Sequence, residues 1–125
     1  MSASTNIELL KIFEALPNDY DVVMYIHSEE YGIKLEDVYP IEKIITKNKC
    51  KNVYFSVYKS KFDIYDTTNT YSVEQLKKIL SDYDYDSKIA LSICALNNKF
   101  QKIEIDKISQ NNSKKRIELI GKLSA

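Results

Sequence analysis

Three aspartates alternate with two tyrosines in the segment 81–88, which reads SDYDYDSK. Asp82, Asp84 and Asp86 have the spacing of the first three ligands of a calcium-binding loop. Such a loop has glycine at its sixth position and glutamate at its twelfth, where this chain has Ser87 and Ile93. The segment therefore favours a turn over a calcium site, and we expect no metal ion and no cofactor.

Residues for acid–base or thiol chemistry are few. The one histidine, His27, has neither a CxxC nor an HExxH motif around it, which argues against a histidine-rich metal site. A Cys–His pair of a thiol enzyme is left open, because Cys50 and Cys94 are both present without a signature around them. The chain also lacks the glycine motifs of phosphate-binding loops and of serine hydrolases. We expect a protein that is not an enzyme and has no catalytic residues.

Basic side chains gather at two predicted hairpin tips. They are Lys47, Lys49 and Lys51 at the first tip, and Lys114, Lys115 and Arg116 at the second. If the fold places both tips in related positions, together they could hold an anion, a nucleic-acid backbone or an acidic protein surface. The alternative is a pair of ordinary polar turns in a lysine-rich chain.

Tyrosine is abundant, with ten residues, whereas tryptophan is absent. Tyr, Lys, Ile and Asn all have A/T-rich codons, so one interpretation is an A/T-rich genome, as in many low-GC bacteria and their phages. The other interpretation is a contact surface, because tyrosine rings are rigid and amphipathic. The candidate contact residues are Tyr54 and Tyr58, with Tyr25 and Tyr31 beside them.

Charge and length limit the class of protein. The 18 Lys and Arg residues balance 18 Asp and Glu residues, which argues against a strongly acidic nucleic-acid mimic and a strongly basic nucleic-acid binder. With 44% apolar residues, a chain of 125 residues can form one core, so we expect a single domain over 1–125. No signal peptide is visible, and the longest apolar run, residues 22–26, is too short to cross a bilayer. We expect a cytoplasmic protein with no membrane partner.

The second half of the chain resembles the first when it is shifted by 64 to 66 residues. Ile7-Glu8 then meets Val73-Glu74, and the two DYD triplets, at 19–21 and 84–86, coincide. We predict two repeat units, 5–59 and 71–123, joined by a connector over 60–70. Chance matching with short gaps is the alternative.

Each unit is predicted to fold as α-β-β-β. Thr5 with Glu8, and Ser72 with Gln75, can form capping boxes at the starts of two short helices. In the first helix we expect an apolar stripe of Ile7, Leu10, Phe13 and Leu16.

The expected strands are 21–27, 33–46 and 52–59 in the first unit, and 87–94, 99–109 and 115–122 in the second. The connector can add a strand at 61–66, and Pro40 is expected to bend its strand or lie at a sheet edge. The predicted fold class is α+β, a tandem pseudo-repeat with antiparallel sheet and two short helices. It would be a monomer with pseudo-twofold symmetry or a homodimer.

The start of the first unit combines an apolar helix pattern with a Pro- and Asp-containing turn and an alternating strand. The residues are Ile7, Glu8, Leu10, Phe13, Leu16, Pro17, Asp19, Val22 and Met24. This pattern resembles the start of small uncharacterised phage and mobile-element proteins, although Glu14 stands where their helices repeat leucine. The resemblance implies a helix–turn–strand start and a phage-like origin, and it implies no activity.

The expected function is therefore binding. The first hypothesis is a non-enzymatic protein that binds and modulates another protein, such as an inhibitor of host defence of the anti-CRISPR type. A toxin-neutralising immunity protein is an alternative of the same class. The other alternative is a nucleic-acid or nucleotide binder that uses the paired basic tips, and its binding would weaken steeply with added salt.

Overall fold

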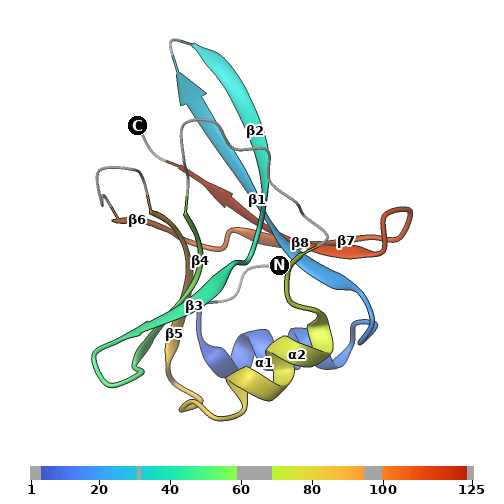
Figure 1. Cartoon of the computed structure of the whole chain (residues 1–125), viewed down its shortest axis with the longest axis vertical. Coiled ribbons are helices and arrows are strands. Elements are labelled where there is room, and N and C mark those ends of the chain that lie inside the picture. The colour runs from blue at the N-terminus through green and yellow to red at the C-terminus, as the bar shows by residue number, and fades with distance from the viewer. Residues whose placement is uncertain (1–3, 31, 59–68, 95–99, 124–125) are drawn as a thin grey trace.

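The computed structural model describes residues 4–30, 32–58, 69–94 and 100–123 (Figure 1). Its elements are α1 (Asn6–Glu14), β1 (Asp21–Glu30), β2 (Ile33–Pro40), β3 (Lys43–Lys47), β4 (Asn52–Tyr58), α2 (Val73–Leu80), β5 (Lys88–Cys94), β6 (Phe100–Ile103), β7 (Lys107–Asn111) and β8 (Arg116–Lys122). The predicted α+β class is confirmed. The expectation of a strand at 61–66 lies outside the described residues.

Two four-stranded sheets make up the fold, with strand orders β2-β1-β8-β7 and β3-β4-β5-β6. We call them sheet B and sheet A, respectively. In each sheet the central pair is parallel, β1 with β8 and β4 with β5, and the outer pairs are antiparallel. Every sheet therefore takes strands from both halves of the chain, so the halves interlock.

The predicted long strands 33–46 and 99–109 are wrong, because the structure divides each into two strands in different sheets. The first break follows Pro40, which has no N–H to donate and ends an edge strand, as its sequence position indicated. Beyond it, the N–H of Ile41 donates to the Thr70 hydroxyl at 2.9 Å, away from both ladders. Each half is thus α-β-β-β-β instead of α-β-β-β.

Both predicted capping boxes are present. The Thr5 side chain accepts from the N–H of Glu8, and the Ser72 side chain accepts from the N–H of Gln75. The predicted stripe of the first helix is confirmed at Phe13 but wrong at its start, since α1 buries Asn6, Leu9 and Phe13, whereas Leu10 is only partly buried. Helix α2 buries the corresponding set, Val73, Leu76 and Leu80.

The hydrogen bonds that join the two halves occur in matched pairs. The N–H of Asn6 donates to Ser87 at 2.8 Å, and the N–H of Val73 donates to Tyr20 at 2.9 Å. Corresponding residues here lie 67 positions apart, so the predicted shift of 64 to 66 is wrong for the helices and first strands. Both DYD triplets lie between helix and strand, with Asp21 already the first residue of β1, and they are not at corresponding positions. The internal repeat itself stays a prediction.

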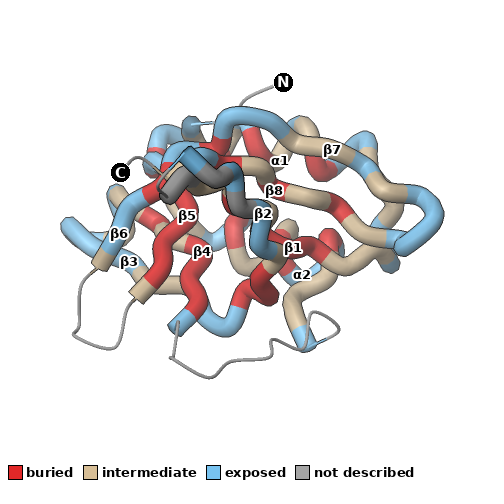
Figure 2. Tube along the Cα trace, turned by 90° about the horizontal axis from the view of Figure 1, so that it is seen from above, coloured by how far each residue is buried: buried red, intermediate tan, exposed pale blue. Residues whose placement is uncertain are grey.

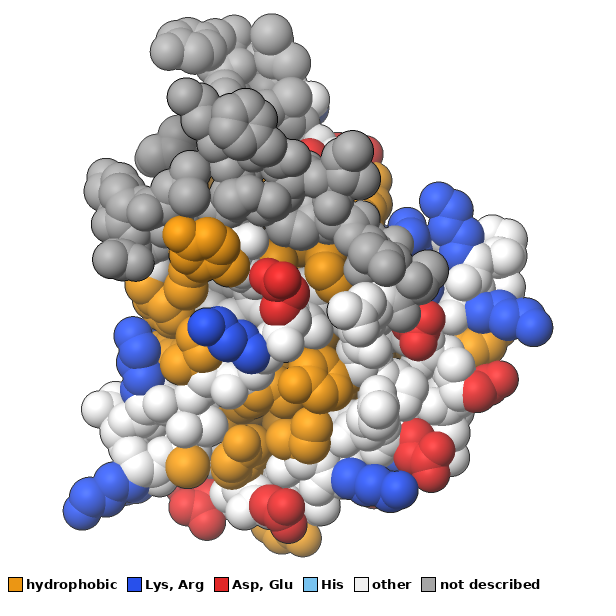
Figure 3. Space-filling view, in the orientation of Figure 1, with side chains coloured by type: hydrophobic (Ala, Val, Ile, Leu, Met, Phe, Trp, Pro, Cys, Tyr) orange, Lys and Arg blue, Asp and Glu red, His pale blue; other side chains and the backbone are white. Residues whose placement is uncertain are grey.

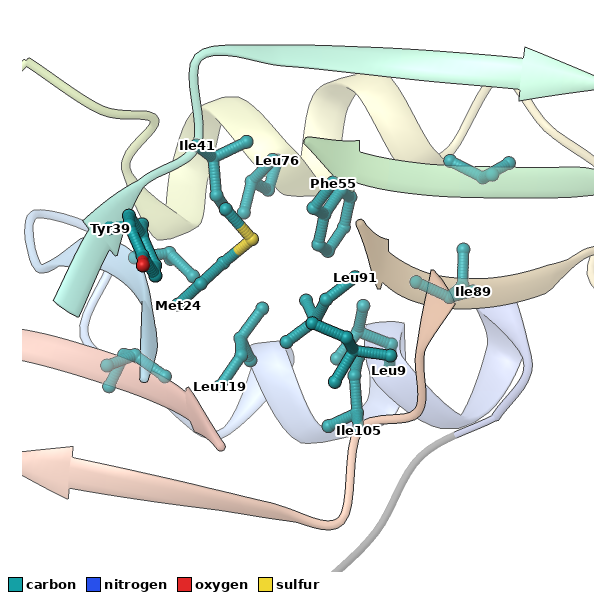
Figure 4. Close-up of a cluster of buried hydrophobic side chains, with 14 of the residues drawn as sticks. Leu9, Met24, Tyr39, Ile41, Phe55, Leu76, Ile89, Leu91, Ile105 and Leu119 are labelled. Atoms are coloured by element: carbon teal, nitrogen blue, oxygen red, sulfur yellow. The ribbon is translucent and has the colours of Figure 1, made fainter. Parts of the chain in front are cut away.

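The core lies between the sheets and the two helices, which lie side by side across one end of them (Figure 1). Leu9 of α1 and Leu76 of α2 point toward Met24, Phe55, and Leu119 from three strands (Figure 4). Burial is concentrated on the central strands, whereas the edge strands and hairpin ends are exposed (Figure 2). Neither helix in the described ranges has the length and apolar character needed to cross a membrane.

The Thr5 cap gives a first testable prediction. Thr5→Ala is expected to lower the free energy of unfolding by about 1 kcal/mol, because one N–H of the first helical turn loses its acceptor. Urea unfolding measures this loss, and Thr5→Ser, which keeps the hydroxyl, is the control. Equal stabilities of the Ala and Ser variants would contradict the cap.

The same cap has a pH signature. The hydrogen bond from the Thr5 side chain lowers the pKa of Glu8 from its ordinary value of 4.5. A lowered carboxyl pKa stabilises the fold above the ordinary value, and this contribution disappears as pH falls through the folded-state pKa. In the Thr5→Ala variant, an NMR titration is expected to find the Glu8 pKa moved back toward 4.5.

Candidate functional site

The two basic hairpin tips lie at opposite ends of the molecule (Figure 1). The first closes the β3–β4 hairpin of sheet A, and the second closes the β7–β8 hairpin of sheet B. Both hairpins are where the sequence predicted them. Because the tips point to different ends, they do not form one site for a small anion, whereas their binding to a nucleic-acid backbone or an acidic protein surface stays a prediction. Lys49 and Lys51 thus lie far from Lys114 and Lys115.

Arg116 is not available at its tip. Its Nη2 lies 2.8 Å from Oε2 of Glu118, and its Nε donates to the same oxygen at 2.9 Å. Both side chains are mostly buried, with 15% and 13% of their surface exposed. The guanidinium is therefore neutralised within β8.

A different basic surface arises on sheet A, on the face turned away from the core. The ladder pairs Lys43 with Ser56, Lys47 with Asn52, and Asn52 in turn with Lys88. Residues paired across neighbouring strands share a face of the sheet, and Lys102, paired with Ser92, belongs to this face too. We call this surface the lysine face. Its members on the described strands are Lys43, Ile45, Lys47, Asn52, Tyr54, Ser56, Tyr58, Lys88, Ala90, Ser92, Cys94, Phe100 and Lys102.

The lysine face has four lysines and no carboxylate on the four strands as the structure describes them. The nearest acidic residues in the chain are engaged. Glu42, just before β3, accepts from the N–H of Tyr58 at 2.7 Å, and Glu104, just after β6, lies 3.1 Å from Lys102. The face is therefore positively charged in a chain with no net charge.

Aromatic rings lie among these lysines. The ring centroids of Tyr54 and Phe100 are 4.9 Å apart in an edge-to-face arrangement. Nζ of Lys47 lies 3.8 Å from the Phe100 centroid and 5.7 Å from that of Tyr54, within cation–π range. Lys47 belongs to β3 and Phe100 to β6, the two edges of sheet A, so the sheet is coiled and this face is concave.

Small residues line the bottom of the concave face. Ser56 and Ser92 are buried and their hydroxyls hydrogen-bond to each other, and Ala90 beside them is buried as well. Their short side chains leave room for the Tyr54 and Phe100 rings to meet above them.

The corresponding face of sheet B differs in charge. The Tyr25 hydroxyl donates to Glu36 at 2.6 Å, and His27 lies 3.5 Å from the same carboxylate. The hydrogen bond to Glu36 raises the pKa of Tyr25. Arg116 and Glu118 on this face compensate each other's charge. His27 is thus part of a surface pair, and the described residues contain no group of three or more His, Cys, Asp or Glu that could hold a metal ion.

The candidate tyrosines lie in different parts of the fold. Tyr54 lies within the aromatic cluster, and Tyr58 is 41% exposed at the end of the same strand. Tyr25 lies on sheet B, and Tyr31 is outside the described residues. Tyr85 in the turn after α2 is the most exposed ring that the structure describes, at 66%.

Hydrophobic side chains also gather between β3 and α2, with lysines lying singly around them (Figure 3).

Lys43, Lys88, Lys102 and Phe100 are site residues that the sequence did not single out. Lys88 and Lys102 begin stretches that alternate polar or small residues with apolar ones, which predicts a solvent-facing position and nothing more. Cys50 and Cys94 are free thiols and partly exposed. No protein-family model matches this chain, and no solved structure matches it significantly.

Proposed function

We propose that the protein acts by binding another protein through the lysine face and modulating it, without catalysis. The observation that carries the proposal is the charge of that face, four lysines beside Tyr54, Tyr58 and Phe100. Aromatic rings, tyrosine among them, are enriched in protein interfaces. The positive charge favours a partner with an acidic surface.

A specific form of this function is inhibition of a host defence system by a phage or mobile-element protein. The chain's small size and its abundance of residues with A/T-rich codons support that form. Neutralisation of a toxin would use the same kind of surface.

Binding of single-stranded nucleic acid is the second candidate, because lysines and aromatic rings on a sheet face suit a phosphate backbone and stacked bases. Two observations favour protein binding over this candidate. The Tyr54 and Phe100 rings contact each other, and Lys47 lies over the face of Phe100, so these rings are not free to stack with bases.

Site-specific photo-crosslinking in the producing cell tests the proposal. A benzophenone side chain replaces Tyr58 on the lysine face or, as a matched control, the exposed Tyr85 on the turn after α2. We expect a protein adduct from position 58 that is absent from position 85 and is lost when Lys43→Glu is added. Identical adducts from both positions, or an adduct that nuclease removes, would contradict binding of a protein through the lysine face.

A further inference from the structure

A small depression lies at one end of the lysine face, where β4, β5 and β6 meet the start of the chain. Its volume is about 150 Å³, and Ala90 and Ile89 supply its apolar lining. The polar lining residues are Ser4, Asn52, Tyr54, Lys88, Lys102 and Glu104. At this end the lysine face is thus both hollowed and lined by charged side chains.

Most polar groups around the depression are hydrogen-bond donors without an acceptor among the described residues. Lys88 forms no ion pair with any residue that the structure describes, and Lys102 is paired with Glu104 at 3.1 Å. The side-chain amide of Asn52 and the hydroxyl of Tyr54 make no hydrogen bond within the described ranges. The Ser4 hydroxyl is already engaged with Glu8 at 3.2 Å. An ammonium, an amide and a phenol are thus left to bind an acceptor.

We propose that this depression binds the carboxylate of an aspartate or glutamate side chain on the partner protein, an inference that rests on the proposed function. The two lysines and one glutamate of the lining give a net charge of +1, which balances the single negative charge of a carboxylate. A phosphate group carries a charge of about −1.5 to −2 and is commonly bound by arginine forks, whereas the lining has no arginine.

The size of the depression agrees with this ligand. At about 150 Å³ the space has room for a small side chain. A glutamate side chain has five non-hydrogen atoms, of which the methylene groups would contact Ala90 and the two oxygens would face Lys88 and Asn52. Tyr54 closes the space toward the aromatic cluster.

The test uses two blocked pentapeptides as probes, Gly-Tyr-Glu-Tyr-Gly and the same peptide with glutamine in place of glutamate. Amide chemical shifts of the full chain are followed by NMR during each titration. We expect saturable shifts at Asn52, Ala90 and Lys102 with the glutamate peptide only. Equal shifts with the glutamine peptide, or saturation by inorganic phosphate at a lower concentration, would overturn the inference.

Matched charge variants sharpen the test. Lys88→Gln is expected to weaken binding of the glutamate peptide about fivefold, and Lys114→Gln, the same change at the far hairpin tip, is expected to leave it unchanged. Lys88→Arg should restore binding, because the positive charge returns. Equal losses from the variants at 88 and 114 would mean that net charge alone attracts the peptide, which overturns the pocket. If the glutamate peptide does not bind but position 58 still gives the protein adduct, the carboxylate site is overturned and the proposed function is supported. If the peptide does not bind and position 58 gives no adduct, both proposals are overturned.

Discussion

Asn6→Ala is expected to lower the free energy of unfolding by about 3 kcal/mol, although the residue is polar and begins a short helix. Asn6 is completely buried, and its Nδ2 donates to the carbonyls of Leu80 at 2.7 Å, Asp84 at 3.1 Å and Tyr83 at 3.3 Å. Leu80 ends α2, where helix carbonyls have no partner within the helix. Alanine would leave these carbonyls without their donor in a site that water does not reach. Urea unfolding followed by circular dichroism measures the loss.

Asn6→Asp separates the lost donor from the lost volume. The aspartate has nearly the same shape, but its charged form would place an acceptor against three carbonyls. Its pKa would therefore be raised in the folded state, so this variant should lose further stability as pH rises above about 3.9, the ordinary value for aspartate. Asn18→Ala, at an exposed turn position, is the control and should change stability little. A loss for Asn6→Ala no larger than for Asn18→Ala would contradict the role of this side chain as a cap of α2.

The sequence predicted the features that depend on neighbours along the chain. A capping box needs only residues three apart, so Thr5 with Glu8 and Ser72 with Gln75 were visible before the fold was known. The two hairpin tips were visible for the same reason. Asn6 was not, because its partners Leu80, Tyr83 and Asp84 come from the other half of the chain. An asparagine at the start of a helix gives no sign of whether it faces solvent or another helix.

The lysine face could not be predicted because it depends on strand register. Lys47 and Lys88 share a face only because Asn52 pairs with both of them, once in an antiparallel and once in a parallel ladder. A parallel pair between strands from different halves has no turn to fix its register. Shifting β5 by one residue would move Lys88 to the core side, so it is the burial of Ile89 and Leu91 that places Lys88 on the open face.

The error in the predicted repeat shift has a physical cause as well. Matching Ile7 to Val73 aligns two apolar residues, whereas the fold places the polar Asn6 where the other half has Val73. Aligning apolar residues is therefore misleading at this position, because Asn6 in the first half donates hydrogen bonds there. The Asn6 amide satisfies the carbonyl of Leu80, the last residue of α2, while its own Oδ1 is buried without a hydrogen-bond partner among the described residues.

Gly121→Val is expected to lower the free energy of unfolding by about 3 kcal/mol, and Gly121→Ala by somewhat less. Gly121 lies on β8, where sheet B passes close to the end of β6 in sheet A. A Cβ at this position would be 2.5 Å from Cγ2 of Ile103, 2.8 Å from the carbonyl oxygen of Glu104 and 3.5 Å from Cδ1 of Leu91. The carbonyl belongs to the backbone and cannot rotate away, so the two sheets would have to separate.

Ile103→Leu tests whether the close approach of the two sheets causes the loss of stability in the Gly121 variants. Leucine lacks the Cγ2 methyl group, so in the double variant one of the two close contacts of the new Cβ disappears and part of the lost stability should return. Gly32→Ala is the control, because Gly32 has φ of 77° and nothing within 4 Å of the added Cβ. Its cost of about 1 kcal/mol would come from the backbone alone, and Ile103→Leu should not reduce it. A Gly121→Val protein as stable as the parent would mean that β8 and β6 do not approach this closely. Since Gly121 pairs with Ile26 in the parallel ladder, such a result would also place the junction of the two halves in doubt.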